Sequence, residues 1–224
     1  MVDVFSAVLF DMDGLLLDTE RIYVRAQRLA AAKLGFEASD DLLHSFVGVS
    51  GTECLRMMEE AAGDGFPMDE YQILWHKTWQ QLVEEGGVPL KDGLEPLLTW
   101  LVDKGVLCAV VTSTHREDAE LCLRTAGIYD VFEHVITGDE VEHNKPAPDI
   151  YLLGAQRLGV APTRCVALED SDAGVLSATG AGMRTVMVPD LRQPSREARA
   201  AAYVVVSSLA DATPLLRAWT GFEL

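Results

Sequence analysis

Two aspartates lie two residues apart near the start of the chain, in the stretch FDMDGLLLDT (10–19), which begins at the end of a short apolar run. In a strand, the side chains of residues i and i+2 point to the same face, about 7 Å apart at their Cα atoms. Asp11 and Asp13 should therefore face one crevice at the end of a strand, where Gly14 permits a sharp turn. Taken alone, such a pair is more often a set of loop or capping residues.

Two further segments place polar groups beyond apolar runs. Thr112, Ser113 and Thr114 offer hydroxyls and backbone N–H groups ahead of a helical pattern, which suits anion binding and ordinary helix capping equally well. Lys145 stands in the polar stretch GDEVEHNKPAPD (138–149), among acids and next to prolines that restrict its backbone. A lone lysine in a turn is usually solvated, but this setting is compatible with an anchored cation.

Glu169 and Asp170, within LEDSDAG (168–174), end another apolar run. Ligands of parallel sheets bind beyond the carboxyl ends of the strands, so these acids should converge with Asp11 and Asp13. Three or four carboxylates in one crevice would repel one another without a counter-ion. Oxygen ligands without histidine or cysteine suit Mg²⁺, which retains waters and accepts phosphate oxygens. The sequence therefore predicts a Mg²⁺ site.

The elements that must position these residues alternate along most of the chain. Short apolar runs rich in β-branched residues are typical of buried parallel strands, and helical patterns separate most of them. The expected strands are 7–10, 107–111, 134–137, 165–168, 185–188 and 203–206. The expected helices between them are 117–126, 149–158 and 171–178. This alternation predicts an α/β fold, a Rossmann-like parallel sheet in three α/β/α layers.

One interval has no strand pattern. After the first strand, helical patterns occupy 20–34, 40–46, 52–62 and 69–85, where a short connection would be expected. We therefore expect an all-α cap domain at 18–87, inserted into a core formed by 1–17 and 88–224. At the catalytic end of a sheet, such an insertion is well placed to act as a lid.

The amino-acid composition limits the classes of molecule that the protein is expected to bind. The chain has 224 residues, 49% of them hydrophobic, and a net charge of −17, which disfavours binding to nucleic acid or anionic membranes. The four cysteines are scattered, with no CxxC or Cys/His cluster, so we expect buried reduced thiols and no zinc site. The N-terminus lacks the features of a signal peptide, and no apolar stretch could span a membrane. The expected protein is cytoplasmic and monomeric.

The ordered set DMDGLLLDT, Thr112, Lys145 in NKPAPD, and LEDSDAG resembles the four motifs of the haloacid dehalogenase superfamily, over essentially the whole chain. The helical insertion resembles the cap of the β-phosphoglucomutase-like subgroup. Within it, FDMDGLLLDTER, GDEVEHNKPAPDI and VMVPD are most similar to the branch of pseudouridine-5′-phosphatases and sugar phosphatases. The resemblance implies a phosphatase acting on a small phosphorylated metabolite.

The resemblance also implies the role of each carboxylate. Asp11 would be the nucleophile that forms an aspartyl-phosphate, and Asp13 the general acid and then the general base. The Mg²⁺ would be held by the side chains of Asp11 and Asp170 and by the main-chain carbonyl of Asp13. Glu169 would be a further ligand or a partner of the ligands.

The remaining motif residues would bind the phosphoryl group. Thr112 would donate a hydrogen bond to it, Ser113 would donate its backbone N–H, and Lys145 would neutralise its charge. These roles suit phosphoryl transfer, which depends mainly on positioning and charge neutralisation.

Three other functions are alternatives to a phosphatase. Dehalogenases of the superfamily lack the second carboxylate, so Asp13 argues for phosphoryl chemistry. A phosphomutase of the β-phosphoglucomutase type would have a cap histidine where this chain has Tyr23, and an arginine at Gly51, after Gly48, Val49 and Ser50. The absence of both residues disfavours a phosphomutase and favours a hydrolase. A phosphomutase is kept as the alternative, followed by a non-catalytic binding protein on the same fold.

The insertion should determine the substrate. The candidates are Glu20 and Tyr23, the turn at 48–52, and Trp75, His76 and Lys77. Trp75 and Trp79 lie one helical turn apart, a spacing that favours a buried stripe over a stacking platform. Pseudouridine 5′-phosphate, a hexose 6-phosphate and 2-phosphoglycolate all remain open as substrates.

Overall fold

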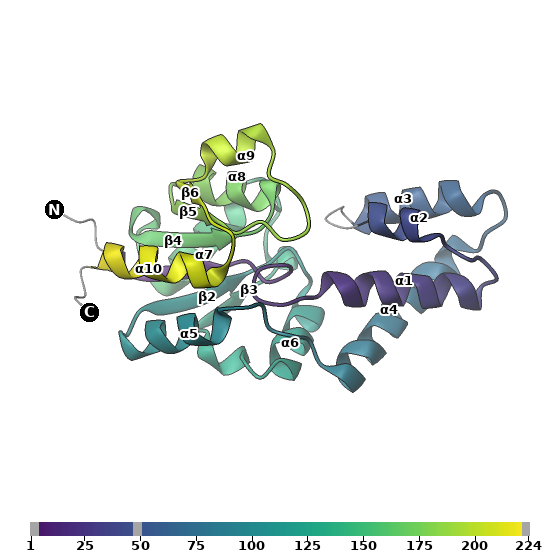
Figure 1. Cartoon of the computed structure of the whole chain (residues 1–224), viewed down its shortest axis with the longest axis horizontal. Coiled ribbons are helices and arrows are strands. Elements are labelled where there is room, and N and C mark those ends of the chain that lie inside the picture. The colour runs from purple at the N-terminus through teal and green to yellow at the C-terminus, as the bar shows by residue number, and fades with distance from the viewer. Residues whose placement is uncertain (1–4, 47–50, 221–224) are drawn as a thin grey trace.

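The computed structural model describes residues 5–46 and 51–220. Its centre is a parallel sheet of six strands in the order β3-β2-β1-β4-β5-β6 (Figure 1). The strands are β1 (Ala7–Phe10), β2 (Leu107–Val111), β3 (His134–Ile136), β4 (Cys165–Glu169), β5 (Arg184–Met187) and β6 (Val204–Val205). The predicted α/β class with a Rossmann-like parallel sheet is thus confirmed.

Helices cover both faces of this sheet and make the three layers. They are α5 (Leu94–Asp103), α6 (Arg116–Thr125), α7 (Asp149–Leu158), α8 (Asp172–Gly180), α9 (Arg196–Ala201) and α10 (Leu209–Thr220). Strand alternation decides which face each residue joins. In β1, Val8 and Phe10 pack in the cluster that includes α5, α6 and α10, whereas Ala7 and Leu9 pack in the cluster that includes α7 and α8.

The strand positions expected from the sequence agree with the structure to within a residue or two. β3 ends one residue early, β5 begins one residue early, and β6 keeps only its two central residues. Around β6, the N–H groups of Tyr203 and Val206 still donate to Thr185 and Met187, each at 2.9 Å. Short 3₁₀ turns, η1 (Tyr129–Val131), η2 (Gly138–Glu140) and η3 (Pro162–Arg164), complete the connections.

The interval after β1 contains four helices: α1 (Glu20–Lys33), α2 (Asp40–Ser45), α3 (Gly51–Ala62) and α4 (Met68–Gly86). Figure 1 shows them extending to one side of the sheet, with α1 and α4 side by side. They enclose a hydrophobic cluster of their own, in which Leu43, Met58 and Tyr71 are almost fully buried. No helix among the described residues is long and apolar enough to cross a membrane.

The chain enters and leaves this helical insertion through adjacent segments. The Asp18 N–H donates to the Pro89 carbonyl and the Lys91 N–H to the Leu16 carbonyl, each at 2.9 Å, and Leu17 forms an isolated bridge with Leu90. Because the same segment follows β1, the insertion is tied to the loop that carries Asp11 and Asp13.

Candidate active site

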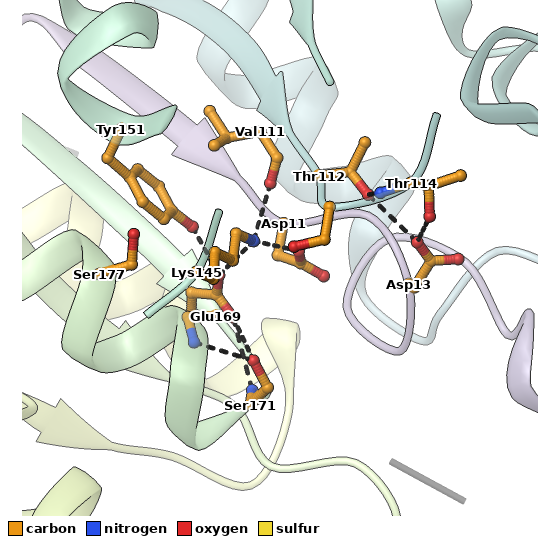
Figure 2. Close-up of polar contacts among 12 residues, drawn as sticks. Asp11, Asp13, Val111, Thr112, Thr114, Lys145, Tyr151, Glu169, Ser171 and Ser177 are labelled. Atoms are coloured by element: carbon orange, nitrogen blue, oxygen red, sulfur yellow. Dashed lines mark hydrogen bonds and ion pairs between the residues drawn. The ribbon is translucent and has the colours of Figure 1, made fainter. Parts of the chain in front are cut away.

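A buried lysine lies at the centre of the polar residues beyond the strand ends (Figure 2). Lys145 Nζ donates to Asp11 Oδ1 at 2.5 Å, to Glu169 Oε1 at 2.6 Å and to the Val111 carbonyl at 2.9 Å. Its side chain is only 5% exposed, so the ammonium group exchanges water for these three oxygens. The ends of β1, β2 and β4 are thereby joined by one cation.

Glu169 is fully buried at the end of β4 and is bonded on both oxygens. Besides Lys145, Oε1 accepts a hydrogen bond from the Tyr151 hydroxyl at 2.7 Å, while Oε2 accepts from the Ser171 hydroxyl at 3.2 Å. Gly174 leaves room for this carboxylate, since a Cβ at that position would lie about 2 Å from its atoms. Glu169 therefore occupies a tight, fully bonded position.

Asp13 faces hydroxyl groups rather than the lysine. Its Oδ1 accepts from Thr19 Oγ1 at 2.7 Å, and its Oδ2 accepts from Thr114 Oγ1 at 2.7 Å and from Thr112 Oγ1 at 3.2 Å. The Thr112 hydroxyl also accepts the Thr114 N–H at 3.1 Å, which fixes its direction. The two aspartates of the opening motif thus have different surroundings, one cationic and one hydroxyl-rich.

Asp170 completes a group of acids that could hold a metal ion. Carboxylate oxygens of Asp11, Glu169 and Asp170 lie within 4.8 Å of one another. Gly14, with φ of 85°, permits this approach, because a Cβ there would lie 2.5 Å from Asp170 Oδ2. Lys145 pairs with two of these three carboxylates, those of Asp11 and Glu169, and the ligand atoms are all oxygen, a set that suits a hard divalent cation.

Burial and mutual repulsion control the charges of this group. Burial raises the pKa of Asp11 well above its usual range, with Lys145 opposing the effect and Glu169 and Asp13 adding to it. Burial, followed by the charges of Asp11 and Glu169, likewise raises the pKa of Asp170. Burial alone would lower the pKa of Lys145, but the Asp11 and Glu169 carboxylates outweigh it and keep the ammonium charged. Binding of a proton or a metal cation would therefore relieve the repulsion among these carboxylates.

The loop that contains Lys145 is fixed against the residues after β2. Asn144 Oδ1 accepts from the Ser113 hydroxyl at 2.8 Å and from the Lys145 N–H at 2.9 Å. Gly138 is needed for this approach, since a Cβ there would lie 2.3 Å from the Ser113 carbonyl oxygen. Ser113, expected to offer its N–H to a phosphoryl group, is thus close to the loop that holds the lysine.

A cavity of about 510 Å³ opens beside Asp13, between the sheet end and the helical insertion. Glu20, Tyr23, Trp75 and His76, four of the specificity candidates, line it, whereas Lys77 is exposed and is not among its described lining residues. The turn expected at 48–52 lies largely outside the described residues. Ser113 and Thr114 line the cavity from the core side.

Trp79 is buried, as a stripe on the helix predicts, but the indoles do more than fill a core. Trp75 and Trp79 both line the cavity, and Trp79 stacks on Tyr23 with ring centroids 5.1 Å apart. Burial raises the pKa of Tyr23, so the phenol stays neutral. The buried stripe expected from the spacing is thus present, and its indoles also form a wall of the cavity.

Sequence patterns did not identify several residues of the site. Tyr151 lies in the first turn of α7 and Thr19 directly before α1, and neither follows a strand. Gln27, four residues after Tyr23 on α1, also lines the cavity. The i+4 spacing from Tyr23 is the signal that could have placed Gln27 on the same helix face.

Comparisons with known proteins agree with this fold. The family model of haloacid dehalogenase-like hydrolases matches residues 8–188. The phosphorylated carbohydrates phosphatase of Thermotoga maritima is 33% identical over 215 residues, covering 95% of this chain and 91% of the relative. A probable pseudouridine-5′-phosphatase of Drosophila melanogaster is 36% identical over 213 residues, covering 92% and 90%.

Among solved structures, that of a putative β-phosphoglucomutase from Thermotoga maritima aligns with a TM-score of 0.84 at 30% identity, covering 95% of this chain and 99% of that one. The expected superfamily and enzyme class are confirmed by these matches. The chain belongs to the haloacid dehalogenase-like hydrolases and is an enzyme of their phosphatase type.

Proposed function

We propose that the chain is a Mg²⁺-dependent phosphomonoester hydrolase that acts on a small phosphorylated metabolite through an aspartyl-phosphate intermediate. The observation that supports this most directly is the buried Lys145, bonded to Asp11 and Glu169 beside the hydroxyl-bound Asp13. A phosphoryl group placed there would meet a nucleophile, a proton donor and a cation within one crevice. The names of the relatives, a carbohydrate phosphatase and a pseudouridine-5′-phosphatase, point to a sugar phosphate or a nucleoside monophosphate.

In the proposed reaction, a carboxylate oxygen of Asp11 attacks phosphorus while the bond to the leaving alcohol breaks. Asp13, protonated at that moment, gives its proton to the departing oxygen. It then removes a proton from the water that attacks the aspartyl-phosphate, releasing inorganic phosphate and restoring Asp11. The hydroxyls of Thr19 and Thr114 hold Asp13 in position for both transfers, while that of Thr112 can turn from Asp13 to the phosphoryl group.

The remaining groups neutralise the charge of the phosphoryl group. Lys145 supplies a fixed ammonium, and Thr112 together with the Ser113 N–H donates hydrogen bonds. Asp11 and Asp170, with the main-chain carbonyl of Asp13 and with Glu169 close by, would hold Mg²⁺. When bound, this ion would offset the repulsion of the carboxylates and withdraw charge from the phosphoryl oxygens.

We also propose that residues 18–87 form a cap domain on a core of residues 1–17 and 88–224. The separate hydrophobic cluster of α1–α4 supports this division, as do the paired segments at Asp18 and Lys91 through which the chain enters and leaves. The cavity beside Asp13 would then lie between cap and core, where cap residues contact the leaving group.

Release of inorganic phosphate from p-nitrophenyl phosphate and a panel of phosphorylated sugars and nucleosides, with Mg²⁺ and with EDTA, tests the proposal. Asp11→Asn should abolish turnover while the protein stays folded, whereas the exposed Asp64→Asn should leave turnover unchanged. Full activity in EDTA, or substantial turnover by purified Asp11→Asn, would remove the metal or the nucleophile from the scheme.

A phosphomutase is the second candidate, because the solved structure of a putative β-phosphoglucomutase is similar to this chain over nearly its whole length. Against it, Tyr23 occupies the position where the resemblance implies a histidine, and its buried phenol stacks on Trp79. Interconversion of a sugar 1-phosphate and 6-phosphate with negligible phosphate release would favour the mutase.

A further inference from the structure

We infer that the alcohol released by this enzyme is uncharged, that the acids along the cavity reject phosphate esters carrying a second anionic group, and that Gln27 binds the uncharged alcohol. The inference rests on the proposed function and narrows its substrate class. The substrates it selects are monophosphates of a polyol or a nucleoside, whose hydroxyl or N–H groups donate hydrogen bonds. Bisphosphates and phosphorylated carboxylic acids are excluded.

The cavity is the space that the leaving group must occupy. Asp13, the proposed proton donor, lies in its wall next to Ser113 and Thr114 of the core. Across from them are Tyr23 of α1 and Trp75 of α4, so aromatic rings of the insertion enclose the far side. A group bonded to a phosphoryl at Asp11 and leaving past Asp13 therefore enters this space.

The charged groups along this cavity are acidic. Asp13, Glu20 and Asp118 line it, and no lysine or arginine is among its described lining residues. Residues 47–50 are Val, Gly, Val and Ser, so they add no cation either. His76 is committed to Asp118, with Nε2 lying 2.9 Å from Oδ2 and 3.1 Å from Oδ1. Lys145, buried against Asp11 and Glu169, serves the phosphoryl end.

Gln27 adds a neutral hydrogen-bond acceptor to this wall. The residue is 3% exposed on α1, and its amide oxygen has no hydrogen-bond partner among the described residues. The amide does interact with the Cys54 side chain, which restricts how it can turn. A buried amide oxygen without a partner is costly, and a donor on the bound alcohol would remove that cost.

Neutral donors on the wall complement this acceptor. The indole nitrogen of Trp75, which lines the cavity, is buried without a hydrogen-bond partner among the described residues. A hydroxyl or an amide of the leaving group that reached this nitrogen would give it an acceptor. A carboxylate or phosphate would also need a counter-charge, and the Glu20 and Asp118 carboxylates would repel it.

The test compares phosphate esters that differ by one carboxylate. Glycerol 3-phosphate is paired with 3-phosphoglycerate, and uridine 5′-monophosphate with orotidine 5′-monophosphate, at pH 8, where histidine is ordinarily neutral. In the pair that the enzyme uses better, we expect kcat/KM for the neutral ester to be about 100-fold higher, or about 2.7 kcal/mol at 1.36 kcal/mol per tenfold. The better pair tells whether the alcohol is a polyol or a nucleoside.

Substitutions then assign the selectivity to this wall. Gln27→Lys should place a cation in the cavity and reduce the neutral-to-anionic ratio about tenfold. The uncharged Gln27→Met should lower kcat/KM for both esters and leave their ratio unchanged. Asp118→Asn, which keeps a partner for His76 but removes one negative charge, should also reduce the ratio. Circular dichroism melting curves identify which variants are folded.

Two outcomes overturn the inference while leaving the phosphatase intact. Equal kcat/KM for neutral and anionic esters in the unmodified enzyme would show that the cavity does not discriminate by charge. An unchanged ratio in folded Gln27→Lys and folded Asp118→Asn would show that other residues do so. By contrast, no phosphate release from p-nitrophenyl phosphate or from any ester with Mg²⁺ would defeat the proposed function itself.

Discussion

At the scale of single residues, Asp13 depends on three hydroxyl donors from two places in the chain. Thr19 precedes the first helix of the insertion, while Thr112 and Thr114 follow β2. These neutral donors fix the direction of a carboxyl group that must give up a proton and then accept one. The contrast with Asp11, which contacts Lys145, gives the two acids different properties.

Thr114→Val tests this positioning. Valine keeps the shape of threonine but removes the 2.7 Å hydrogen bond to Asp13 Oδ2, so we expect kcat to fall about tenfold with KM nearly unchanged. Thr125→Val is the matched control, because that exposed hydroxyl bonds only to carbonyls of its own helix. Steady-state kinetics on both variants measure the effect. A Thr114→Val enzyme as active as Thr125→Val would mean that the hydroxyl has no part in placing Asp13.

The motif residues were predictable for a simple reason. Asp11, Thr112 and Glu169 lie at or beyond strand ends, and parallel strands bring those ends to one edge. Tyr151 contacts Glu169 from the side of a helix, and this contact depends on how α7 packs against the sheet. Local sequence patterns do not predict how a helix packs on a sheet, so site residues placed by such packing were not predicted.

At the scale of elements, α8 approaches β4 so closely that one glycine is required. A Cβ at Gly174 would lie 1.9 to 2.0 Å from the carboxylate of Glu169. Gly174→Ala should therefore lower the free energy of unfolding by at least ~2 kcal/mol, because Glu169 is held by its own hydrogen bonds and cannot easily move.

Gly180→Ala is the control for that substitution. It lies at the end of the same helix, and its added Cβ would meet only Pro148 at 3.6 Å, an ordinary contact. This change should be neutral or stabilise slightly. Urea denaturation of both variants gives the two free energies, provided that the slope with denaturant is unchanged. Equal stability of the two variants would contradict the tight fit around Glu169.

A second contact between elements involves Glu140, at the end of η2. Its carboxylate accepts from Arg116 of α6 and from Arg157 of α7, each at 2.6 Å, and so connects two helices. Burial alone would raise the pKa of Glu140, but Arg157, the Thr137 N–H and Arg116 outweigh it and lower the pKa below the ordinary 4.5. A lowered pKa stabilises the fold above the ordinary value, and this contribution is lost as the pH falls through the lower value.

Glu140→Gln should therefore lower the free energy of unfolding by about 1–2 kcal/mol at pH 7. The difference from the unmodified protein should shrink as the pH falls below about 4.5, the ordinary glutamate value. Glu142→Gln, exposed in the same loop, should have little effect at either pH. Thermal melts across this range measure both differences. A Glu140→Gln penalty that stays constant down to pH 3 would exclude ionic bonding as its cause.

The elements themselves were predicted unevenly. The buried strands were found because several apolar residues in a row suit a sheet covered on both faces. Helices α5, α9 and α10 had no expected counterpart. α9 is six residues long with two arginines and a glutamate, and α10 contains Pro214, which usually argues against a helix. Their positions depend on packing against the sheet, as with Ala198 against Met187 and Val175.

At the scale of the whole molecule, a protein with a net charge of −17 concentrates acids at the site that must bind an anion. Lys145 offsets part of that charge, and a bound divalent cation would offset more. Because such an ion would bind the folded chain and not the unfolded one, it should couple activity to global stability. Stability is therefore a measure of the metal site that does not depend on turnover.

Mg²⁺ at about 100 times its Kd should increase the free energy of unfolding by about 2.7 kcal/mol. For a chain of this size, the Tm should rise by roughly 5–10 °C relative to EDTA. Asp170→Asn should lose most of this shift, because it removes one of the three clustered carboxylates. In EDTA the same variant should be more stable than the unmodified protein, since burial and the charges of Asp11 and Glu169 disfavour an ionised Asp170. Asp64→Asn, exposed and remote in sequence from these acids, should keep the full shift. Scanning calorimetry measures all three proteins, and an equal Mg²⁺ shift in Asp170→Asn would place the ion elsewhere.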